Sequence, residues 1–262
     1  MQKPGFPAFR YPLHSWQKKL HQKFLLQFFL PRTALQVLQS FAHLQPQFFS
    51  INIEKKALQF YTLFIMELYI IRHGKTIWNA ERRLQGRTDI ELNQEGTDKA
   101  IKLGEKLKDI HFDLIYSSPL KRAFTTAKLI KGERNIKIIT DECLTELCFG
   151  EQEGKDFNEW QKKENPFNAF FTSPENYIPP KNGESLPHII ERTKDFLKTK
   201  IEPEYKKYSR IMIVAHGALN AALMCNIEQR PLSNFWGDGL QQNLEETIFT
   251  FDGTLWKKLS KK

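Results

Sequence analysis

Two histidines, each preceded by an apolar run and followed by glycine, are the residues of this chain best suited to chemistry. His73 ends the run 68–73, LYIIRH, and His216 ends the run 211–216, IMIVAH. Short apolar runs rich in β-branched residues are typical of strands buried on both faces, and ligands bind outside the carboxyl ends of such strands. If the two strands are neighbours, the two imidazoles lie side by side. A lone His-Gly is often only a hydrogen-bonded strand end, so the repetition, with Arg72 before the first histidine, indicates a site.

Two further groups at predicted element ends complete a set suited to phosphoryl transfer. Arg122 falls in the first turn of a helix after the predicted strand 113–116, and Glu146 follows the predicted strand 136–139. Two arginines on one small anion indicate a dianionic phosphoryl group, because guanidinium pairs with phosphate oxygens. One imidazole can attack phosphorus, and the other, when protonated, can stabilise the growing charge. A carboxylic acid can protonate the leaving alkoxide.

Other phosphatase chemistries lack their residues here. Cys225 and Arg230 are one residue closer than the Cys-x5-Arg of the cysteine class, and Cys143 and Cys148 have no arginine at that distance. The chain has no Asp-x-Asp after a strand, no phosphate-binding P-loop and no His/Asp cluster typical of a two-metal site. We therefore expect neither a metal nor a cofactor.

The elements that must position these groups alternate between strand and helix. Asn93 caps a predicted helix with one apolar face, and Ser117-Ser118-Pro119 predicts the start of the helix that carries Arg122. A helix is expected from Gly183 to about Ile201, and a hairpin over 246–259 ends the pattern. This alternation predicts an α/β fold, a three-layer α/β/α sandwich with a mainly parallel central sheet.

Residues 150–182 interrupt the alternation of strands and helices, and they contain six aromatic residues and four prolines. This composition favours a short aromatic-rich flap over the strand ends. The alternative is a satellite hydrophobic cluster under a long loop.

The first 65 residues differ in kind from the rest. They hold nine glutamines and eight basic residues against a single acid, Glu54. Phe24 to Leu30 resembles a signal-peptide core but lacks a clean cleavage site, and the segment has too few arginines and serines for a mitochondrial presequence. We expect residues 1–65 to be an untranslated or nonessential extension rather than a targeting signal, and 66–262 to be one catalytic domain. A chain beginning at Met66 should then keep its activity and stability.

Charge, hydropathy and cysteine content indicate which partners and which cellular compartment to expect. The net charge is +9, yet residues 66–262 hold 31 basic and 29 acidic residues, so no basic nucleic-acid stripe is indicated for them. No run approaches the length of a membrane span. Three cysteines are too few and too oddly numbered for a disulfide framework, which fits a reducing, cytoplasmic setting. The expected partner is a small phosphomonoester, and the oligomeric state stays open.

The motif Arg72-His73-Gly74-x-Thr76, with Asn79 three residues on, resembles the signature of the histidine phosphatase superfamily, also called phosphoglycerate mutase-like. The resemblance runs from about Met66 to the C-terminus. It implies that His73 becomes phosphohistidine, that Arg72, Asn79, Arg122 and His216 hold the phosphate, that Glu146 donates the proton and that Thr76 orders the loop. The short flap and Gly183-Glu184-Ser185 resemble the small broad-specificity and α-ribazole phosphatases. Lys75 and the acidic pair Glu245-Glu246 depart from the family pattern, which bears on substrate preference more than on activity.

Three functions remain open from the sequence. The first is a metal-independent phosphomonoester hydrolase that works through phosphohistidine. The second is a cofactor-dependent phosphoglycerate mutase, which needs the same pocket closed to water. The third, a catalytically silent phospho-binding protein, is disfavoured because all the key groups are present.

Overall fold

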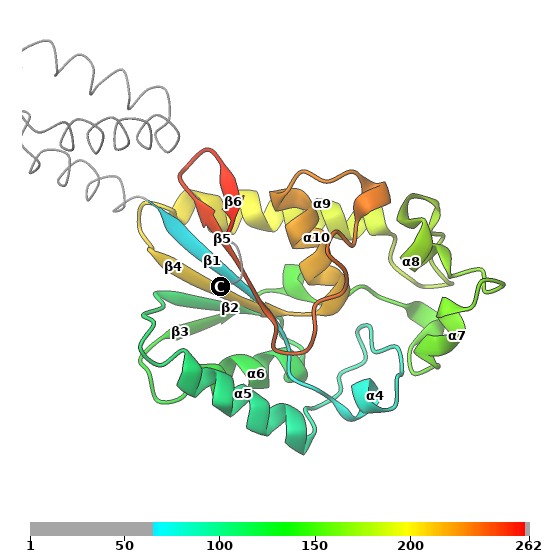
Figure 1. The fold of residues 1–262 in the computed structure, drawn as a ribbon, viewed down its shortest axis with the longest axis horizontal. Coiled ribbons are helices and arrows are strands. Elements are labelled where there is room, and N and C mark those ends of the chain that lie inside the picture. The colour runs from blue at the N-terminus through cyan, green and yellow to red at the C-terminus, as the bar shows by residue number, and fades with distance from the viewer. Residues whose placement is uncertain (1–64, 260–262) are drawn as a thin grey trace, which may run out of the picture. The chain divides into compact units, whose positions relative to one another are not determined.

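The computed structural model describes residues 65–259, whose centre is a six-stranded sheet of order β3-β2-β4-β1-β5-β6 (Figure 1). The strands β3, β2, β4 and β1 are parallel, whereas β5 runs antiparallel to β1 and β6 antiparallel to β5. This confirms the predicted α/β fold with a mainly parallel sheet. The strands are β1 (Met66–Arg72), β2 (Leu114–Ser117), β3 (Lys137–Thr140), β4 (Arg210–Ala215), β5 (Glu246–Phe251) and β6 (Trp256–Lys258).

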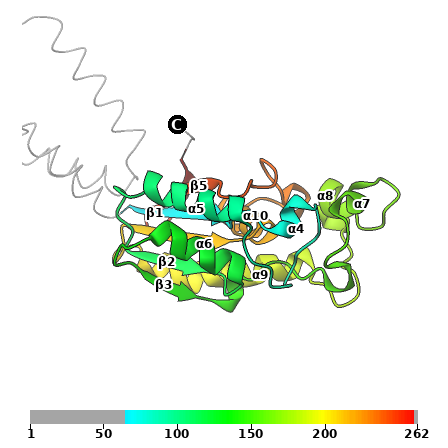
Figure 2. The ribbon, with the colours of Figure 1, turned by 90° about the horizontal axis from the view of Figure 1, so that it is seen from below.

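Helices cover both faces of the sheet, as Figures 1 and 2 show from two directions. Helices α5 and α6 pack on one face, and α9 and α10 pack on the other. The α-helices within residues 65–259 are α4 (Ile77–Ala80), α5 (Gln94–Lys106), α6 (Lys121–Lys131), α7 (Phe157–Gln161), α8 (Ala169–Thr172), α9 (Leu186–Phe196) and α10 (Gly217–Ile227).

Strand β1 lies between β4 and β5, and its side chains alternate between the two layers. Leu68 and Ile70 belong to the cluster under α9 and α10, whereas Tyr69 and Ile71 belong to the cluster under α5 and α6. All four side chains are buried, as the uninterrupted apolar run predicted. Burial on both faces holds the carboxyl end of β1, and so Arg72, in a fixed position.

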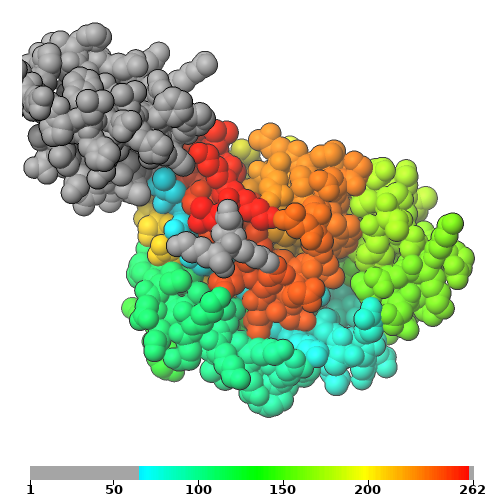
Figure 3. Space-filling model, viewed as in Figure 1, coloured from blue at the N-terminus to red at the C-terminus, as the bar shows by residue number. Residues whose placement is uncertain are grey.

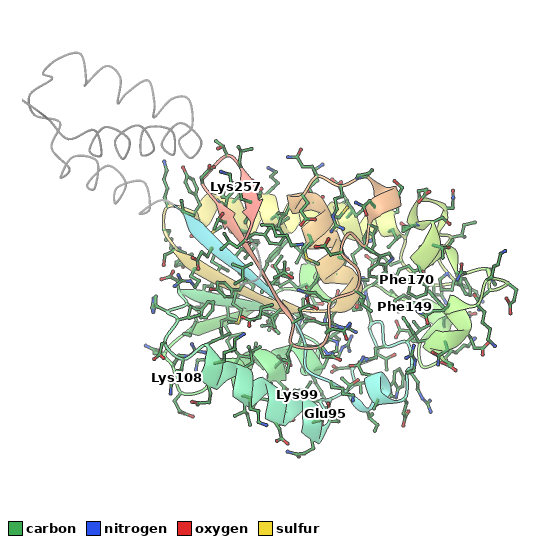
Figure 4. All side chains as sticks on the ribbon, in the orientation of Figure 1. Glu95, Lys99, Lys108, Phe149, Phe170 and Lys257 are labelled. Carbon is green, nitrogen blue, oxygen red and sulfur yellow. The ribbon has the colours of Figure 1, made fainter. Side chains whose placement is uncertain are left out.

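The flap contains α7 and α8 and is joined to the main core. Phe149 and Phe170 meet edge to face at 5.5 Å between ring centroids where the flap joins the sheet domain (Figure 4). Trp160 and Tyr177 belong to the same cluster as the strand residues of β1 and β4. Figure 3 shows the flap beside the orange segment after α10 and the cyan segment after β1. The alternative of a separate satellite cluster is therefore wrong, because the flap aromatics continue the core.

Two predicted boundaries need correction. Ser117 is the last residue of β2, and α6 begins at Lys121 with Leu120 as its N-cap, so the predicted cap at Ser117-Ser118 is wrong. The Ser118 hydroxyl instead accepts a hydrogen bond from the Leu120 amide at 3.3 Å, which orders the connection. The helix predicted from Gly183 to Ile201 begins at Leu186 after its N-cap Ser185, and a π-helical turn, Leu197–Ile201, extends it. The expectations about residues 1–64 lie outside the described residues.

Candidate active site

A pocket of about 340 Å³ opens at the carboxyl ends of β1 and β4. The predicted site residues on its wall are Arg72, His73, Asn79, Arg122 and Glu146. His216 is fully buried and is not part of that wall, although the next residues, Gly217 and Ala218, are. The pocket is thus assembled from segments up to 171 residues apart in the chain, and His216 lies immediately behind its surface.

The two histidines are brought together by the pairing of their strands. Arg72 at the end of β1 is level with Ala215 at the end of β4, and the His73 amide donates to the Ala215 carbonyl at 2.9 Å. The ring centroids of His73 and His216 are consequently 5.2 Å apart. The strands are neighbours, as the two His-Gly sequences required if they were to form one site.

The His73 ring is fixed by its own backbone. Its Nδ1 lies 2.7 Å from the Gly74 carbonyl oxygen. A carbonyl only accepts, so Nδ1 carries the proton and, in the neutral ring, Nε2 carries the lone pair. Burial, followed by the charges of Arg122 and Arg72, lowers the pKa of His73 well below its usual 6.5. The imidazole is therefore neutral at physiological pH, with a defined tautomer.

Gly74 is required by a close backbone approach. A Cβ at this position would lie 2.9 Å from the carbonyl oxygen of Gly96 in α5. The Gly74 amide also donates to the Thr126 hydroxyl of α6 at 2.9 Å. The peptide that orients the His73 ring is thus held by helices on the same side of the sheet.

The His216 ring is buried without any hydrogen-bond partner among residues 65–259 for either nitrogen. Burial first, and then the charge of Arg122, lower its pKa well below the usual value. Buried polar atoms without partners are uncommon in native proteins, and a bound ligand can satisfy them. The ring is therefore placed to donate or accept a proton only when something polar enters the pocket.

Two guanidinium groups, that of Arg122 completely buried and that of Arg72 partly buried, make the inner pocket strongly positive. Arg122 is completely buried and donates to the carbonyl oxygens of Thr88 at 2.8 Å and Gly86 at 2.6 Å. Arg72 donates to the carbonyl oxygen of Gln241. Burial lowers the pKa of Arg122 to about 10, which still leaves it charged. The Nε atoms of both arginines lack a partner within the described residues, and an oxyanion would supply one.

The Glu146 carboxylate sits at the N-terminus of α10. Its Oε1 accepts from the amides of Leu147 and Leu219, both at 2.9 Å, and its Oε2 accepts from the Ala218 amide at 3.2 Å. These amides and the helix dipole fix the carboxylate on the pocket wall, at the residues that follow His216-Gly217 in the chain. Glu146 and His216 are therefore positioned by the same helix end.

A second buried carboxylate, that of Glu184, holds in place two arginines that bind the backbone of the Glu146 loop. It accepts from Arg192 Nε at 2.8 Å, Arg87 Nη2 at 3.2 Å and His188 Nδ1 at 2.6 Å. Both arginines also donate to the Glu146 carbonyl oxygen, at 3.4 Å from Arg87 and 3.3 Å from Arg192. Burial alone would raise the pKa of Glu184, but its hydrogen bond to Arg192 and the nearby positive charges lower it overall. From the sequence we placed Glu184 at a helix start and in a family-like segment but gave it no role in the site, so this support was missed.

Asn79 belongs to a capping box at the start of α4. Its side-chain oxygen accepts from the Thr76 amide at 3.1 Å, and its own amide donates to the Thr76 hydroxyl at 3.0 Å. Asn243, which was not predicted, donates to the His73 carbonyl oxygen at 2.9 Å and also lines the pocket. Thr76 orders the loop as expected, and Asn243 holds the same loop from a segment far along the chain.

The residues that depart from the family pattern are not part of the pocket wall. Lys75 forms an ion pair at 2.7 Å with Glu95, which also pairs with Lys99 on the exposed side of α5 (Figure 4). Glu245 and Glu246 are not among the pocket-lining residues. Within residues 65–259, no group of three or more His, Cys, Asp or Glu side chains is arranged to hold a metal ion. None of the helices described there has both the length and the apolar character needed to cross a bilayer.

Comparison with known proteins places the chain in a family. The sequence profile of the histidine phosphatase superfamily (branch 1) matches residues 68–261, so the chain belongs to this superfamily. Over 160 residues, which are 60% of this chain and 69% of the relative, it is 36% identical to phosphoglycerate mutase-like protein 4 of Arabidopsis thaliana. It is 34% identical to a metal-independent phosphoserine phosphatase of the same plant, over 63% of this chain and 70% of that protein. The solved structure of YhfR from Bacillus stearothermophilus superposes with a TM-score of 0.67 and 31% identity, covering 74% of this chain and 95% of that one.

The superfamily resemblance inferred from the sequence is thereby confirmed. The chain is an enzyme of the phosphoglycerate mutase-like histidine phosphatase type, and the class acts on small phosphorylated molecules.

Proposed function

We propose that the enzyme is a metal-independent phosphomonoester hydrolase that works through a phosphohistidine at His73. The observation that carries this proposal is the contact between His73 Nδ1 and the Gly74 carbonyl, which leaves the Nε2 lone pair of a neutral ring in a pocket with two guanidinium groups. Such a ring attacks phosphorus without first losing a proton. The two arginines supply the positive charge that metal ions supply in other phosphatases.

The reaction has two steps. In the first, Nε2 attacks phosphorus, the bond from phosphorus to the leaving oxygen breaks, and Glu146 gives that oxygen a proton. In the second, Glu146 takes a proton from water as the water oxygen attacks the phosphohistidine, and the bond from Nε2 to phosphorus breaks to release phosphate. Arg72, Arg122 and Asn79 bind the phosphoryl oxygens in both steps.

His216 has a separate task in this mechanism. In the free enzyme its pKa is depressed by burial and by Arg122, so the ring is neutral. A dianionic phosphoryl group bound beside it reverses part of that effect, because an opposite charge favours the protonated ring. The protonated His216 then stabilises the extra charge on the phosphoryl oxygens in the transition state.

The test is a panel of phosphomonoesters assayed for phosphate release in excess EDTA, alongside a phosphoglycerate mutase assay. We expect release to persist in EDTA and an acid-labile phosphoenzyme to be trapped on rapid quenching. Loss of turnover on chelation, restored by a divalent ion, would overturn the mechanism. Phosphate transfer between phosphoglycerates without net release would instead establish the mutase, and inactivity on every substrate would favour the silent binding protein.

We further propose that the enzyme works in the reducing environment of the cytoplasm. The support is that Cys143, Cys148 and Cys225 are all free thiols. Cell fractionation of the tagged full-length chain tests this, and recovery in an organelle or an oxidising compartment would contradict it.

A further inference from the structure

The Arg72 guanidinium is held by a segment far along the chain. Its Nη1 donates to the main-chain carbonyl oxygen of Gln241, whereas its Nε lacks a hydrogen-bond partner among residues 65–259. Gln241 lies after α10 and before β5, in a stretch without regular secondary structure. The position of the Gln241 carbonyl therefore bears directly on where one of the two phosphate-binding arginines points.

The side chain of Gln241 anchors this stretch in the core. It is 4% exposed, while Gly239 before it and Gln242 after it are exposed. Its Nε2 donates to the Ile70 carbonyl oxygen of β1 at 3.1 Å and to the Thr247 hydroxyl of β5 at 2.8 Å. Through its side chain and its main chain, Gln241 is thus bound to the last residues of the strand that carries the guanidinium.

Asn220 of α10 completes the anchor. Its side chain is fully buried, and its Nδ2 donates to Gln241 Oε1 at 2.8 Å. The Ile70 carbonyl can only accept, so Gln241 turns its NH2 group toward β1 and its oxygen toward Asn220. Asn220 Oδ1 has no hydrogen-bond partner within the described residues. Because a buried amide with an unmatched oxygen lowers stability relative to an apolar side chain, positioning rather than stability accounts for this contact.

The anchor joins the ends of β1 and β4 without touching the substrate pocket. Asn220 lies one turn after His216, since its amide donates to the His216 carbonyl oxygen at 3.0 Å. The stretch that Gln241 holds also supplies Asn243, which donates to the His73 carbonyl oxygen at 2.9 Å. Gln241 itself is not on the pocket wall, so any effect on catalysis must pass through these neighbours.

We propose that Gln241, held by Asn220, is a positioning residue that fixes the Arg72 guanidinium for phosphate binding. This rests on the proposed function, in which Arg72 binds the phosphoryl oxygens. A guanidinium binds phosphate through planar, directional hydrogen bonds, so a displacement weakens binding although the charge is unchanged. Every variant of Gln241 keeps its main-chain carbonyl, so replacing the side chain changes where that carbonyl lies and not whether it is present.

The binding test titrates inorganic phosphate, the product of the proposed reaction, into the full-length chain well below its melting temperature. Gln241→Met has nearly the same size but no hydrogen bonds. It should weaken phosphate binding about fivefold, a loss typical of the coupling between residues in contact. Asn220→Leu should act in the same direction, and it carries the test if Gln241→Met does not fold.

Asn226→Leu is the matched control for both variants. Asn226 lies in the same helix and donates to the Ile190 carbonyl oxygen at 2.9 Å and to the Thr193 hydroxyl at 3.0 Å, on the side of α9. Its replacement removes a similar set of hydrogen bonds away from Arg72. It should lower the melting temperature to a similar extent and leave the phosphate affinity unchanged.

A double-mutant cycle with Arg72→Met separates positioning from a general loosening of the fold. Arg72→Met alone should weaken phosphate binding by about 10- to 100-fold, the cost of one charged hydrogen-bonding group. In that background Gln241→Met should change the affinity by about twofold or less, because no guanidinium remains to be positioned. Three results would overturn the proposal: an unchanged affinity in Gln241→Met and Asn220→Leu, the same loss with and without Arg72, or an equal loss in Asn226→Leu.

Arginine labelled with ¹⁵N at Nε gives an NMR readout that needs no ligand. The Arg72 Nε–Hε signal, assigned by its absence from Arg72→Met, should shift or broaden in Gln241→Met and stay in place in Asn226→Leu. If Arg72→Met binds phosphate as tightly as the wild type, the phosphate-binding role that the proposed function gives Arg72 fails. The NMR signal then decides the positioning role alone: a shift supports it and an unmoved signal overturns it. If phosphate binding depends on Arg72 but neither affinity nor signal responds to Gln241→Met, the proposed function stands and the positioning role fails.

Discussion

The ends of β1 and β4 share one sequence pattern, an apolar run followed by His-Gly, but the backbone that follows the two histidines differs. After His73 the chain enters a loop, and the Gly74 carbonyl holds the ring nitrogen Nδ1. After His216 the chain enters α10 at once, with His216 as its N-cap, and both ring nitrogens lack partners among the described residues. One imidazole has a fixed tautomer, and the other is free to change its protonation.

The glycines in the two turns also serve different ends. Gly74 permits close contact with the backbone of α5, whereas a Cβ at Gly217 would lie 2.7 Å from the Leu240 side chain and 3.6 Å from the guanidinium carbon of Arg72. The first glycine fixes the ring that precedes it, and the second leaves room for a phosphate-binding group. Identical dipeptides therefore acquire different roles from the backbone that follows them, and the experiments below are designed to separate those roles.

The largest expected effect is at His73. His73→Ala should abolish turnover and the covalent phosphoenzyme, because Nε2 is the proposed nucleophile. His216→Ala should lower kcat by about 10²- to 10³-fold, the usual cost of losing one group that stabilises transition-state charge, yet still form the phosphoenzyme. Stopped-flow turnover and acid-quench labelling measure both quantities. A labelled His73→Ala protein, or complete loss of labelling in His216→Ala, would show that the roles are wrongly assigned.

The next effect concerns the carboxylate docked on α10. Glu146→Gln should slow alkyl phosphates by roughly 10²- to 10⁴-fold, the usual contribution of a general acid. It should slow p-nitrophenyl phosphate much less, because that leaving group scarcely needs a proton. The comparison of kcat for the two substrates separates proton donation from binding. Equal losses would remove Glu146 from the acid role and leave it as a residue that shapes α10.

A smaller effect is expected at Glu184, which reaches the reaction only through Glu146. Glu184→Gln weakens the contacts to Arg87 and Arg192, which both hold the Glu146 carbonyl. We expect a loss of about 1–3 kcal/mol in stability and about tenfold in kcat on alkyl phosphates. At a temperature well below melting, p-nitrophenyl phosphate should be affected less. Glu95→Gln, which breaks an exposed ion pair on α5, is the control and should change neither. A uniform loss on both substrates in Glu184→Gln would indicate a purely structural residue.

The sequence was sufficient for the parts of the site that depend on strand pattern. Uninterrupted apolar runs fixed the ends of β1 and β4, and hence the positions of Arg72, His73 and His216. It did not show that His216 lies behind the pocket wall, because that depends on how the side chain turns after the strand. Asn243, Glu184 and Gln241 were missed as site residues for a related reason. Their contacts are with segments distant in the chain, which no local pattern predicts.

The smallest effect concerns folding stability and pH, where the two histidines should behave alike. Both have a folded-state pKa well below 6.5, so below that pH the unfolded chain binds protons that the folded chain does not. Stability should therefore fall as the pH is lowered through 6.5. Each histidine that stays neutral when folded contributes a loss of up to about 1 kcal/mol between pH 6.5 and 5.5. Urea unfolding at pH 7.5, 6.5 and 5.5, in a buffer without phosphate, measures this loss.

The variants His73→Gln and His216→Gln make the stability experiment decisive, because glutamine does not titrate in this range. Each should remove a similar share of the acid-dependent loss, although the two differ widely in catalysis. Added phosphate should then separate them again. It binds the folded wild type, raises the pKa of the nearby His216 and flattens the pH dependence, and that flattening should disappear in His216→Gln but persist, weakened, in His73→Gln. If phosphate acts equally in both variants, His216 does not change its protonation on binding, and the difference between the two turns is one of position alone.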